Sequence, residues 1–350
     1  MDFDGIITLA HGSGGFDSAD LMQAVFAKHF RNDILARLED AAVVNIGAQR
    51  LAISTDSFVV EPLIFPGGDI GRLAVCGTVN DVLMSGAAPK YLTCGFILEA
   101  GLSISLLDSI CASLAEVAMD AGVAIICGDT KVIEGKNPSG GLMINTTGIG
   151  VFDAEDDAAS VASPSPAGLH AGDSLIVSGA LGDHHAAILS ARMGIENEIQ
   201  SDCTLLTPVI EALAAAGVHV HAMRDVTRGG LATVLNELAA ASGVSIELTE
   251  GTAPIHPPVK ALCGILGLDP LYMGNEGKMV FSIAPEDESA ALAAVRATEI
   301  GREAAAIGRV LSRNRRSDET LIEPQVFLRT AIGGTRRIDA LYGEGLPRIC

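Results

Sequence analysis

The chain has 350 residues, 49% of them hydrophobic, and a formal net charge of −20 at pH 7. This length predicts two domains, because a single hydrophobic core rarely serves more than about 250–300 residues. A surface this acidic repels nucleic acid and anionic membranes, so we expect neither as a partner. The start of the chain lacks the pattern of a signal peptide and no stretch has the length of a membrane span, so we expect a cytoplasmic protein.

The first part of the chain divides into two segments. Residues 1–40 contain a glycine-rich opening and an amphipathic stretch at 18–38, which is predicted to form a helix. Residues 41–155 alternate short β-rich runs with helical patterns and form the first predicted domain. The elements predicted there are strands at 43–46, 51–54, 91–98, 124–126 and 142–151, and helices at 70–85 and 103–121.

A stretch rich in Asp, Ala, Ser and Pro at 153–173 separates this domain from a second one at 170–332. The elements predicted in the second domain are strands at 175–178, 244–248, 279–283 and 304–310, helices at 182–193, 205–216, 229–242 and 286–297, and a β-rich end at 322–332. Two halves that each mix strands with pairs of helices predict an α+β fold rather than one doubly wound sheet. Residues 333–350, which include four glycines, are predicted to form a flexible tail.

The last residue, Cys350, has a different setting from the other six cysteines. Several of those lie in apolar runs, and no C-x-x-C pair occurs, so we expect buried reduced thiols and no disulfide framework or zinc knuckle. A thiol at a mobile terminus has no core to fill. It is either incidental to a frayed end or a reactive group that the tail carries, and the tail alone favours neither.

Acidic or Asn residues lie in several short motifs beside glycine or other small residues, two of them just after predicted strands. They are Asp56, Asn80, Asp81, Asp129 and Asp225. The usual glycine-rich signatures of P-loop and dinucleotide folds are missing. Carboxylates together with phosphate oxygens hold Mg²⁺, and neighbouring glycines let a phosphate approach the backbone. Each residue alone is more often a turn aspartate, but the group together predicts a metal–nucleotide site.

Four further residues carry side chains capable of acid–base work. Lys131 and Glu276 lie in glycine-rich loops, where an isolated charge is usually a solvated surface group. His184 and His185 are adjacent at the start of a predicted helix, where they could equally cap it, and no metal-ligand spacing such as H-x-x-x-H accompanies them. We therefore assign no catalytic role to either histidine.

The order of the motifs resembles the HypE family of hydrogenase maturation factors. This family belongs to the superfamily of aminoimidazole ribotide synthetase (PurM), selenophosphate synthetase and thiamine monophosphate kinase. The matching segments are residues 11–15 (HGSGG), 56–60 (DSFVV), 65–71 (FPGGDIG), 77–81 (GTVND), 127–131 (CGDTK), 148–150 (GIG), 182–184 (GDH), 224–230 (RDVTRGG), 274–277 (GNEG) and 347–350 (PRIC). Two features depart from the family: His185 replaces its usual glycine, and residues 314–324 match no motif.

The resemblance implies a two-domain PurM-like fold, a homodimer formed through the N-terminal domains, and ATP bound beside that sheet. It also implies that Asp56, Asp81, Asp129 and Asp225 hold Mg²⁺, and that these residues with Asn80, Gly128 and Thr227 bind ATP. Lys131 and Glu276 would lie where the tail delivers the thiol of Cys350. Either could take the proton in the reaction, and we favour Glu276.

The family's reaction gives Cys350 a specific task. A partner carbamoyltransferase, HypF, loads a carbamoyl group onto the terminal cysteine, ATP drives its dehydration to a thiocyanate, and the cyanide passes to iron on a HypC–HypD scaffold. Residues 333–350 would reach about 60 Å when fully extended at about 3.3 Å per residue. The resemblance therefore implies a swinging thiol.

Two kinds of alternative stay open. Another enzyme of the superfamily is one, although selenophosphate synthesis calls for a reactive Cys or selenocysteine near residues 11–15, and purine or thiamine enzymes do not need Cys350. A scaffold that binds maturation partners and uses ATP structurally is the other.

Overall fold

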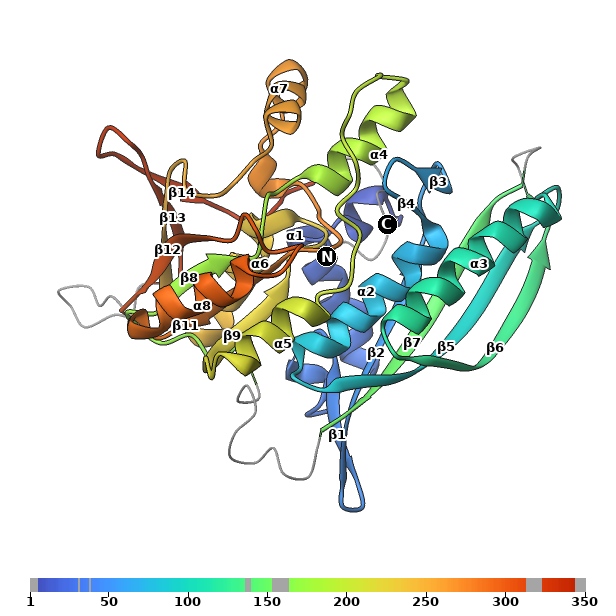
Figure 1. Ribbon diagram of the computed structural model, residues 1–350, viewed down its shortest axis with the longest axis horizontal. Helices are drawn as coiled ribbons and strands as arrows, with labels where there is room; N and C mark the ends of the chain where they lie inside the picture. Colours follow the sequence, from blue (N-terminus) through green and yellow to red (C-terminus); the bar gives the residue numbers. More distant parts are fainter. Residues whose placement is uncertain are drawn as a thin grey trace.

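The computed structural model describes residues 6–30, 32–37, 39–135, 140–152, 164–312 and 323–343. Two β-sheets with helices packed against them account for most of these residues (Figure 1). The predictions for Cys350, for residues 314–322 and for the end of the tail fall outside the described residues.

The first domain is built on a five-stranded sheet. Its strands, in spatial order, are β1 (Ala42–Ile46), β2 (Gln49–Phe58), β7 (Leu142–Val151), β5 (Ala88–Glu99) and β6 (Ala124–Ile133). Neighbouring strands run antiparallel except β5 and β6, which are parallel. A short hairpin of β3 (Ile64–Phe65) and β4 (Gly68–Asp69) leads into the first long helix.

Helices α2 (Ile70–Met84) and α3 (Ile104–Asp120) cover one face of this sheet (Figure 1). Strand β7 alternates buried and more exposed residues, as expected for a strand with one covered face. Helix α2 starts at Asp69, whose carboxylate accepts hydrogen bonds from the backbone N–H of Gly71 and Arg72 at 2.7 and 3.0 Å. Almost every residue of α2 is buried, because this helix lies between its own sheet and the second domain.

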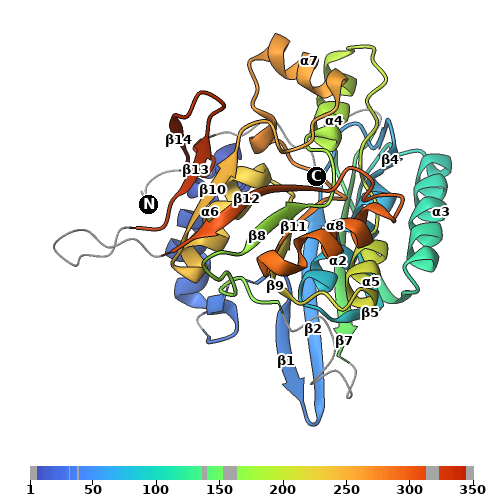
Figure 2. The same cartoon turned by 60° about the vertical axis from the view of Figure 1, so that its left-hand side comes forward.

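The second domain contains a seven-stranded sheet. Its strands, in spatial order, are β14 (Thr335–Ile338), β13 (Val326–Arg329), β10 (Ser245–Thr249), β12 (Ala305–Leu311), β8 (Ser174–Val177), β11 (Met279–Ile283) and β9 (Val220–Asp225). The central strands are buried on both faces, since α5 (Thr207–Ala215) and α8 (Glu288–Arg296) pack on one side and α6 (Gly230–Ser242) on the other. Helices α4 (Asp183–Met193) and α7 (Pro257–Leu266) pack together at the top of both views (Figure 2).

One hydrophobic cluster spans the two domains. It joins side chains of α2 and α3, such as Leu73 and Ile110, with Leu206 and Phe281 of the second domain. Because the two halves share a core, the groups at their junction are held in place from both sides. The candidate site lies at this junction.

The structure corrects several predicted elements. Strand β6 continues to Ile133, well beyond the predicted 124–126, and β9 and α7 have no counterpart among the predicted elements. The amphipathic stretch at 18–38 is not one helix but a short α-helix, α1 (Phe16–Leu21), followed by a π-helical segment and a separate 3₁₀ turn. Within the described ranges, no helix is long and apolar enough to span a membrane.

The tail also begins later than the predicted residue 333. Strand β14 (Thr335–Ile338) pairs with β13, and the following residues contact the N-terminal segment. The backbone N–H of Phe16 donates to the carbonyl of Leu341 at 3.0 Å, and that of Gly343 donates to the carboxylate of Asp17 at 2.9 Å. The ring of Tyr342 stacks on Phe16 with 4.1 Å between centroids. The chain is therefore anchored as far as residue 343.

Candidate active site

Four carboxylates from separate segments meet where the domains join. Asp56 lies on β2, Asp81 on α2, Asp225 at the end of β9, and Glu276 in the loop before β11. Burial raises the pKa of both Asp81 and Glu276, and the charges of Asp225 and Asp56 raise both further. The fold thus gathers acidic residues that lie far apart in the sequence.

Strand β2 and helix α2 position two of these groups. Asp81 accepts a hydrogen bond at 2.8 Å from the hydroxyl of Ser54, two residues before Asp56 on the same face of β2. The hydroxyl of Thr78 lies 3.4 Å from the carboxylate of Asp56 and 2.5 Å from the hydroxyl of Thr146. These hydrogen bonds between short polar side chains hold the carboxylates of Asp56 and Asp81 between α2 and the sheet.

Asn275 joins the loops that carry Asp225 and Glu276. Its backbone N–H and its side-chain amide both donate to the carbonyl of Val226 at 3.0 Å, directly after Asp225. Its side-chain oxygen accepts from the backbone N–H of Gly182 at 2.7 Å. Asn275 is fully buried, so these bonds are shielded from water and tie three loops together.

Glu276 is almost completely enclosed, with 4% of its surface exposed. Its backbone N–H donates to the carboxylate of Asp202 at 3.1 Å. A Cβ atom at Gly77 would lie 3.9 Å from the Glu276 carboxylate, so the side chain points towards α2. Burial raises the pKa of Glu276 well above its usual range, and the charges of Asp225 and Asp202 raise it further.

The same forces act on the neighbouring carboxylates. Burial raises the pKa of both Asp81 and Asp225 well above the ordinary range, and mutual repulsion adds to the effect. A divalent cation would remove this repulsion, since carboxylate oxygens are the ligands that Mg²⁺ prefers. The donor set of Asp56, Asp81 and Asp225 therefore fits a Mg²⁺ ion and the phosphates it accompanies.

An ion-pair network beside the cluster was not among the sequence predictions. Arg224 contacts Asp40 at 2.6 Å and Glu237 at 3.0 Å. Burial raises the pKa of Asp40 although Arg224 lowers it, and the charge of Asp40 in turn raises the pKa of Asp225. Asp40 precedes β1 and lies outside the motifs that contain the other residues, so the motif pattern could not identify it.

Asn80 and Thr227 lie at the same junction with different surroundings. The side chain of Asn80 donates to the carbonyl of Thr204 at 3.0 Å and accepts from the backbone N–H of Leu206 at 2.8 Å. Asn80 is buried and joins α2 to the segment before α5, which is a structural task. Thr227 is half-buried in the loop after Asp225, and its carbonyl accepts from the N–H of Gly230 at 3.0 Å.

Gly128, Asp129 and Lys131 lie elsewhere, on edge strand β6. Asp129 pairs in register with Gly95, which pairs with Asn145, and the side chain of Asn145 donates to the hydroxyl of Ser57. Ser57 and Asp56 are adjacent on β2, so Asp129 and Asp56 face opposite sides of the sheet.

Asp129 and Lys131 form an ion pair of 2.7 Å on the open face, with side-chain exposures of 72% and 70%. This contact lowers the pKa of Asp129, chiefly through the hydrogen bond from Lys131. Gly128 has a structural reason to be glycine, because a Cβ there would lie 2.1 Å from the carbonyl oxygen of Cys94 on β5. One chain therefore does not bring these three residues into the acidic cluster.

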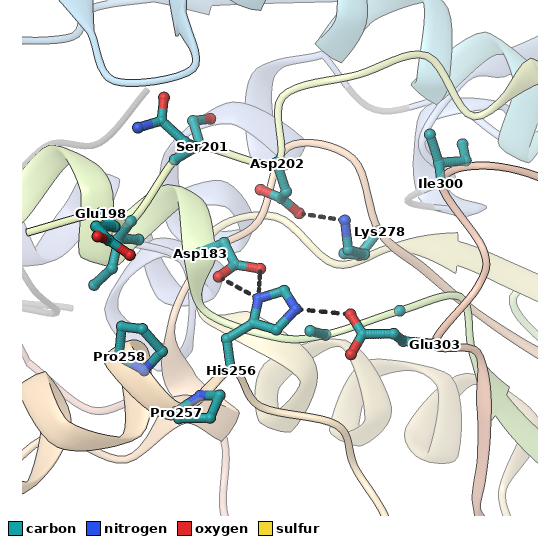
Figure 3. A pocket seen from close by; sticks show the side chains of 14 residues that line it. Asp183, Glu198, Ser201, Asp202, His256, Pro257, Pro258, Lys278, Ile300 and Glu303 are labelled. Atoms are coloured by element: carbon teal, nitrogen blue, oxygen red, sulfur yellow. Dashed lines mark hydrogen bonds and ion pairs between the residues drawn. The ribbon is translucent and has the colours of Figure 1, made fainter.

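A cavity of about 530 Å³ is lined in part by Asp202 and Lys278 (Figure 3). Lys278 pairs with Asp202 at 3.1 Å on its wall, and Asp202 also holds the backbone of Glu276. His256 bridges Asp183 at 2.9 Å and Glu303 at 2.7 Å. Burial alone would lower the pKa of His256, but its hydrogen bonds to the two carboxylates outweigh burial and raise it.

His185, which departs from the family motif, supports the Glu276 loop from α4. The ring Nδ1 of His185 accepts a hydrogen bond from the backbone N–H of Gly274 at 3.3 Å. The backbone N–H of His185 donates to the carbonyl of Gly274 at the same distance. Burial lowers the pKa of His185 to about 3, so the ring is neutral. His184 contacts the hydroxyl of Ser201 at 2.7 Å. Both histidines thus have packing roles.

Comparison with known proteins places this geometry in a family. Residues 38–152 match the N-terminal domain of AIR synthase related proteins, and residues 170–318 match their C-terminal domain. The chain thus belongs to the AIR synthase related proteins, with the two-domain, PurM-like α+β fold expected from the sequence.

Within that class the relatives are more specific. Carbamoyl dehydratase HypE of Rhodobacter capsulatus is 45% identical over 350 residues, which cover 98% of each chain. A crystal structure of HypE in complex with ATP has a TM-score of 0.78 and 44% identity, covering 99% of this chain and 100% of that one. The HypE–HypF complex has a TM-score of 0.82 and 40% identity, covering 92% and 99%. The chain therefore belongs to the HypE family of carbamoyl dehydratases, which act in hydrogenase maturation.

Proposed function

We propose that the chain uses Mg²⁺-ATP to dehydrate a carbamoyl group on the thiol of Cys350 to a thiocyanate, and so supplies cyanide for the iron of a [NiFe] hydrogenase. The observation that carries this proposal is the meeting of Asp56, Asp81, Asp225 and Glu276 at the domain junction. The HypE–ATP structure supports it, since that relative binds ATP on the same fold.

The reaction converts an S-carbamoyl cysteine and ATP into an S-cyano cysteine, ADP and phosphate. ATP, when bound, supplies the phosphoryl group that makes the carbamoyl oxygen a good leaving group. Asp56, Asp81 and Asp225 would hold the Mg²⁺ that accompanies its phosphates, and Gly128, Asp129, Asn80 and Thr227 remain predicted contacts. The chain's own task is to position the carbamoyl group and to remove its two N–H protons as the C≡N bond forms.

Glu276 is our choice for the base. Its side chain is enclosed beside the other carboxylates. The pKa of Glu276 is raised from that of an ordinary surface carboxyl towards the working pH. A base with a pKa near the working pH combines a useful ionised fraction with a strong pull on the proton. Positive charge bound at Asp225 and Asp56 would favour the ionised form that accepts the proton.

We further propose that the protein forms a homodimer through the open face of the five-stranded sheet. Tyr91 and Ile97 on β5 and Ile133 on β6 lie on this face with 47%, 40% and 41% of their surfaces exposed. Apolar side chains on an uncovered sheet face indicate a protein partner. A second copy offers the same face, as a two-fold interface requires. Such a dimer would place Lys131 in the interface, next to the partner chain and away from the acidic cluster of its own chain.

The length of chain beyond its last anchor sets the reach of Cys350. Seven residues follow Gly343, which Ser13 and Asp17 hold through hydrogen bonds of 3.1 and 2.9 Å. Seven extended residues span at most about 25 Å. The anchor adjoins the active-site loops, because the N–H of Leu341 donates to Thr233 at 3.3 Å and a Cβ at Gly14 would lie 3.1 Å from the carbonyl of Arg228. This reach suits a thiol that works close to residues 225–230.

The partners of the cycle follow from the same proposal. The HypE–HypF complex supports a carbamoyltransferase of the HypF type as the donor. A HypC–HypD iron scaffold as the acceptor, and a cytoplasmic location, remain predictions from the family resemblance.

The test is mass spectrometry of the full-length protein after incubation with HypF, carbamoyl phosphate and ATP. We expect Cys350 to carry a cyano adduct, which is lighter than the carbamoyl adduct by 18 Da, the mass of water. Cys350→Ala should carry no adduct, and Glu276→Gln should accumulate the carbamoyl form without dehydrating it. Dehydration at the normal rate in Glu276→Gln would remove Glu276 as the base.

The same experiment separates the alternatives. A scaffold that uses ATP structurally would carry no thiocyanate under any condition. A carbamoyl adduct found on Cys350→Ala would place the carrier thiol elsewhere and refute the role of the terminal cysteine.

A further inference from the structure

Two histidines and an aspartate meet near the point where the chain enters the second domain. His170 and Asp173 lie in the turn before β8, and His221 lies near the start of β9. Strands β8 and β9 both pair with β11, so the two segments flank the same end of one strand. His221 precedes Asp225 by four residues, a separation of about 13 Å along a strand. The cluster is therefore distinct from the acidic residues of the candidate active site.

The three side chains turn their electron-pair donors towards one another. The Nδ1 atoms of His170 and His221 are 3.2 Å apart, and the Nδ1 of His221 is 2.9 Å from the carboxylate of Asp173. The side chain of Asp173 is only 4% exposed and that of His221 only 15%. His170 closes the cluster from the solvent side.

Hydrogen bonding alone satisfies this arrangement poorly. A proton on His221 Nδ1 can serve Asp173 well and His170 only at a poor angle, since one N–H points in one direction. A proton on His170 Nδ1 that serves His221 leaves the lone pair of His221 facing the carboxylate at 2.9 Å. Protons on both nitrogens set two N–H groups against each other at 3.2 Å. A cation among the three atoms would use all three lone pairs together.

The backbone positions these groups without help from an ion. The N–H of His170 donates to the Asp173 carboxylate at 2.9 Å, and the N–H of Asp173 donates to the carbonyl of His170 at 3.1 Å. The turn is tied to β12, where Val310 donates to the carbonyl of Asp173 and accepts from Gly172, both at 2.9 Å. Such preorganisation reduces the entropy lost when a ligand binds.

We propose that His170, Asp173 and His221 bind a divalent transition-metal ion of the Zn²⁺ type through two imidazole Nδ1 atoms and one carboxylate oxygen. Bonds of about 2.0–2.2 Å at a tetrahedral centre place ligand atoms about 3.3–3.5 Å apart, so small adjustments of the observed 2.9 and 3.2 Å would seat the ion. Imidazole nitrogen favours Zn²⁺, Co²⁺, Ni²⁺ or Cu²⁺ over Mg²⁺ and Ca²⁺. Three protein ligands leave one position for water or another donor.

The bound ion would join two parts of the second domain that meet at this end of the sheet. It would link the turn at 170–173 to β9, the strand that ends at Asp225 of the candidate active site. Binding should strengthen at higher pH, because imidazole must lose its proton before it can coordinate. The site needs neither ATP nor Cys350, so its test does not depend on the proposed enzymatic function.

The experiment titrates the metal-free, full-length protein with Co²⁺ in excess Mg²⁺, which is added to fill the Mg²⁺ site proposed at the acidic cluster. Co²⁺ bound to nitrogen and oxygen gives visible d–d absorption without the near-ultraviolet band of a thiolate ligand, which separates this site from any cysteine. We expect one equivalent to bind with that spectrum and to be displaced by Zn²⁺. His170→Ala should weaken binding at least about 100-fold, since even the outer partners of metal ligands contribute 10–100-fold.

Two variants make the result interpretable. His170 is exposed, so His170→Ala should fold normally, which circular dichroism can verify. His29→Ala replaces another exposed histidine and should bind Co²⁺ as the unaltered protein does. Binding that persists unchanged in His170→Ala, that is lost equally in His29→Ala, or that shows a thiolate band would overturn the proposed site, as would the absence of binding.

Discussion

The most informative experiment tests whether Lys131 serves the active site of its own chain or that of a partner chain. Lys131 lies on β6, three strand positions from β2, which is about 14 Å at the usual strand spacing of about 4.8 Å. It also faces the open side of the sheet, whereas Glu276 points towards α2 on the covered side. A lysine side chain cannot cross a sheet, so Lys131 cannot reach the cluster of its own chain through β5, β7 and β2. We predict that it acts on the partner's cluster from the dimer interface, passing the edge of the partner's sheet and not crossing that sheet.

Mixed dimers test this geometry through the fraction of active sites that they regain. A dimer of a Lys131→Ala chain and a Glu276→Gln chain has one site with both residues intact if Lys131 acts on the partner, and no such site if it acts within its own chain. Random pairing yields about half mixed dimers in a two-fold assembly, so the mixture should regain about a quarter of the wild-type sites. Purified mixed dimers carrying two different tags should regain about half.

The assay is ATP-dependent conversion of the carbamoyl adduct to thiocyanate, measured by mass spectrometry on each preparation. The reciprocal control pairs a wild-type chain with a chain carrying both substitutions, and these dimers should be inactive. Activity in the reciprocal pair, with none in the first pair, would show that Lys131 works within its own chain and would refute the argument from sheet faces. Lys131 is exposed, so its replacement should leave the fold intact.

Three further outcomes are expected. Asp81→Asn should weaken Mg²⁺-ATP binding by roughly 10- to 100-fold in calorimetry, the effect of losing one charged contact of about 1.5–3 kcal/mol; an unchanged affinity would exclude Asp81 from the site. Asn80→Ala should lower the free energy of unfolding in urea by about 2–6 kcal/mol, since two backbone partners lose their bonds at about 1–3 kcal/mol each. The exposed Asn145→Ala should cost under about 1 kcal/mol, and equal effects would contradict the structural role of Asn80. The gain in melting temperature from Mg²⁺ and nucleotide should grow from pH 5 to pH 8 and flatten in Asp225→Asn, and a gain independent of pH would count against the carboxylate cluster.

The sign of the pH effect follows from the direction of the pKa shifts. The pKa values of Asp81 and Asp225 are raised above the ordinary 3.8, and that of Glu276 above 4.5. A raised carboxyl pKa contributes stability that is fully present below the unfolded value and is lost as pH rises through the folded value. Without a cation, these groups therefore destabilise the fold increasingly above about pH 4. A bound divalent ion offsets that loss, and its benefit is largest where all three are ionised.

Part of the fold was predictable because local patterns determine it. Strands β7 and β11 agree with the predicted ranges, and the helix predicted at 70–85 is α2 within one residue. Strand β9 was missed because residues 220–225 alternate poorly, with Arg224 and two histidines nearby. Tertiary packing forms this strand, since it pairs with the buried β11 and its Arg224 is neutralised by Asp40.

The candidate site divides in the same way. Acidic residues in short motifs with glycine or other small residues pointed to Asp56, Asp81 and Asp225, and the structure brings their carboxylates together with Glu276. The face of the sheet on which Asp129 lies could not be inferred, because it depends on the register of β5 with β6. That register includes an irregularity between Leu92 and Thr93, and a shift by one residue moves a side chain to the other face.

The anchored tail changes how the terminal thiol can reach its partners. A free segment from residue 333 would have carried the thiol about 60 Å, far enough to meet a partner anywhere nearby. Contacts of Leu341, Tyr342 and Gly343 with the N-terminal segment shorten that reach to about 25 Å. A partner that loads or unloads Cys350 must then dock beside this anchor, close to the loop at 225–230. Loading, dehydration and transfer would occur within one neighbourhood, and a short tether keeps the effective concentration of the thiol high at each step.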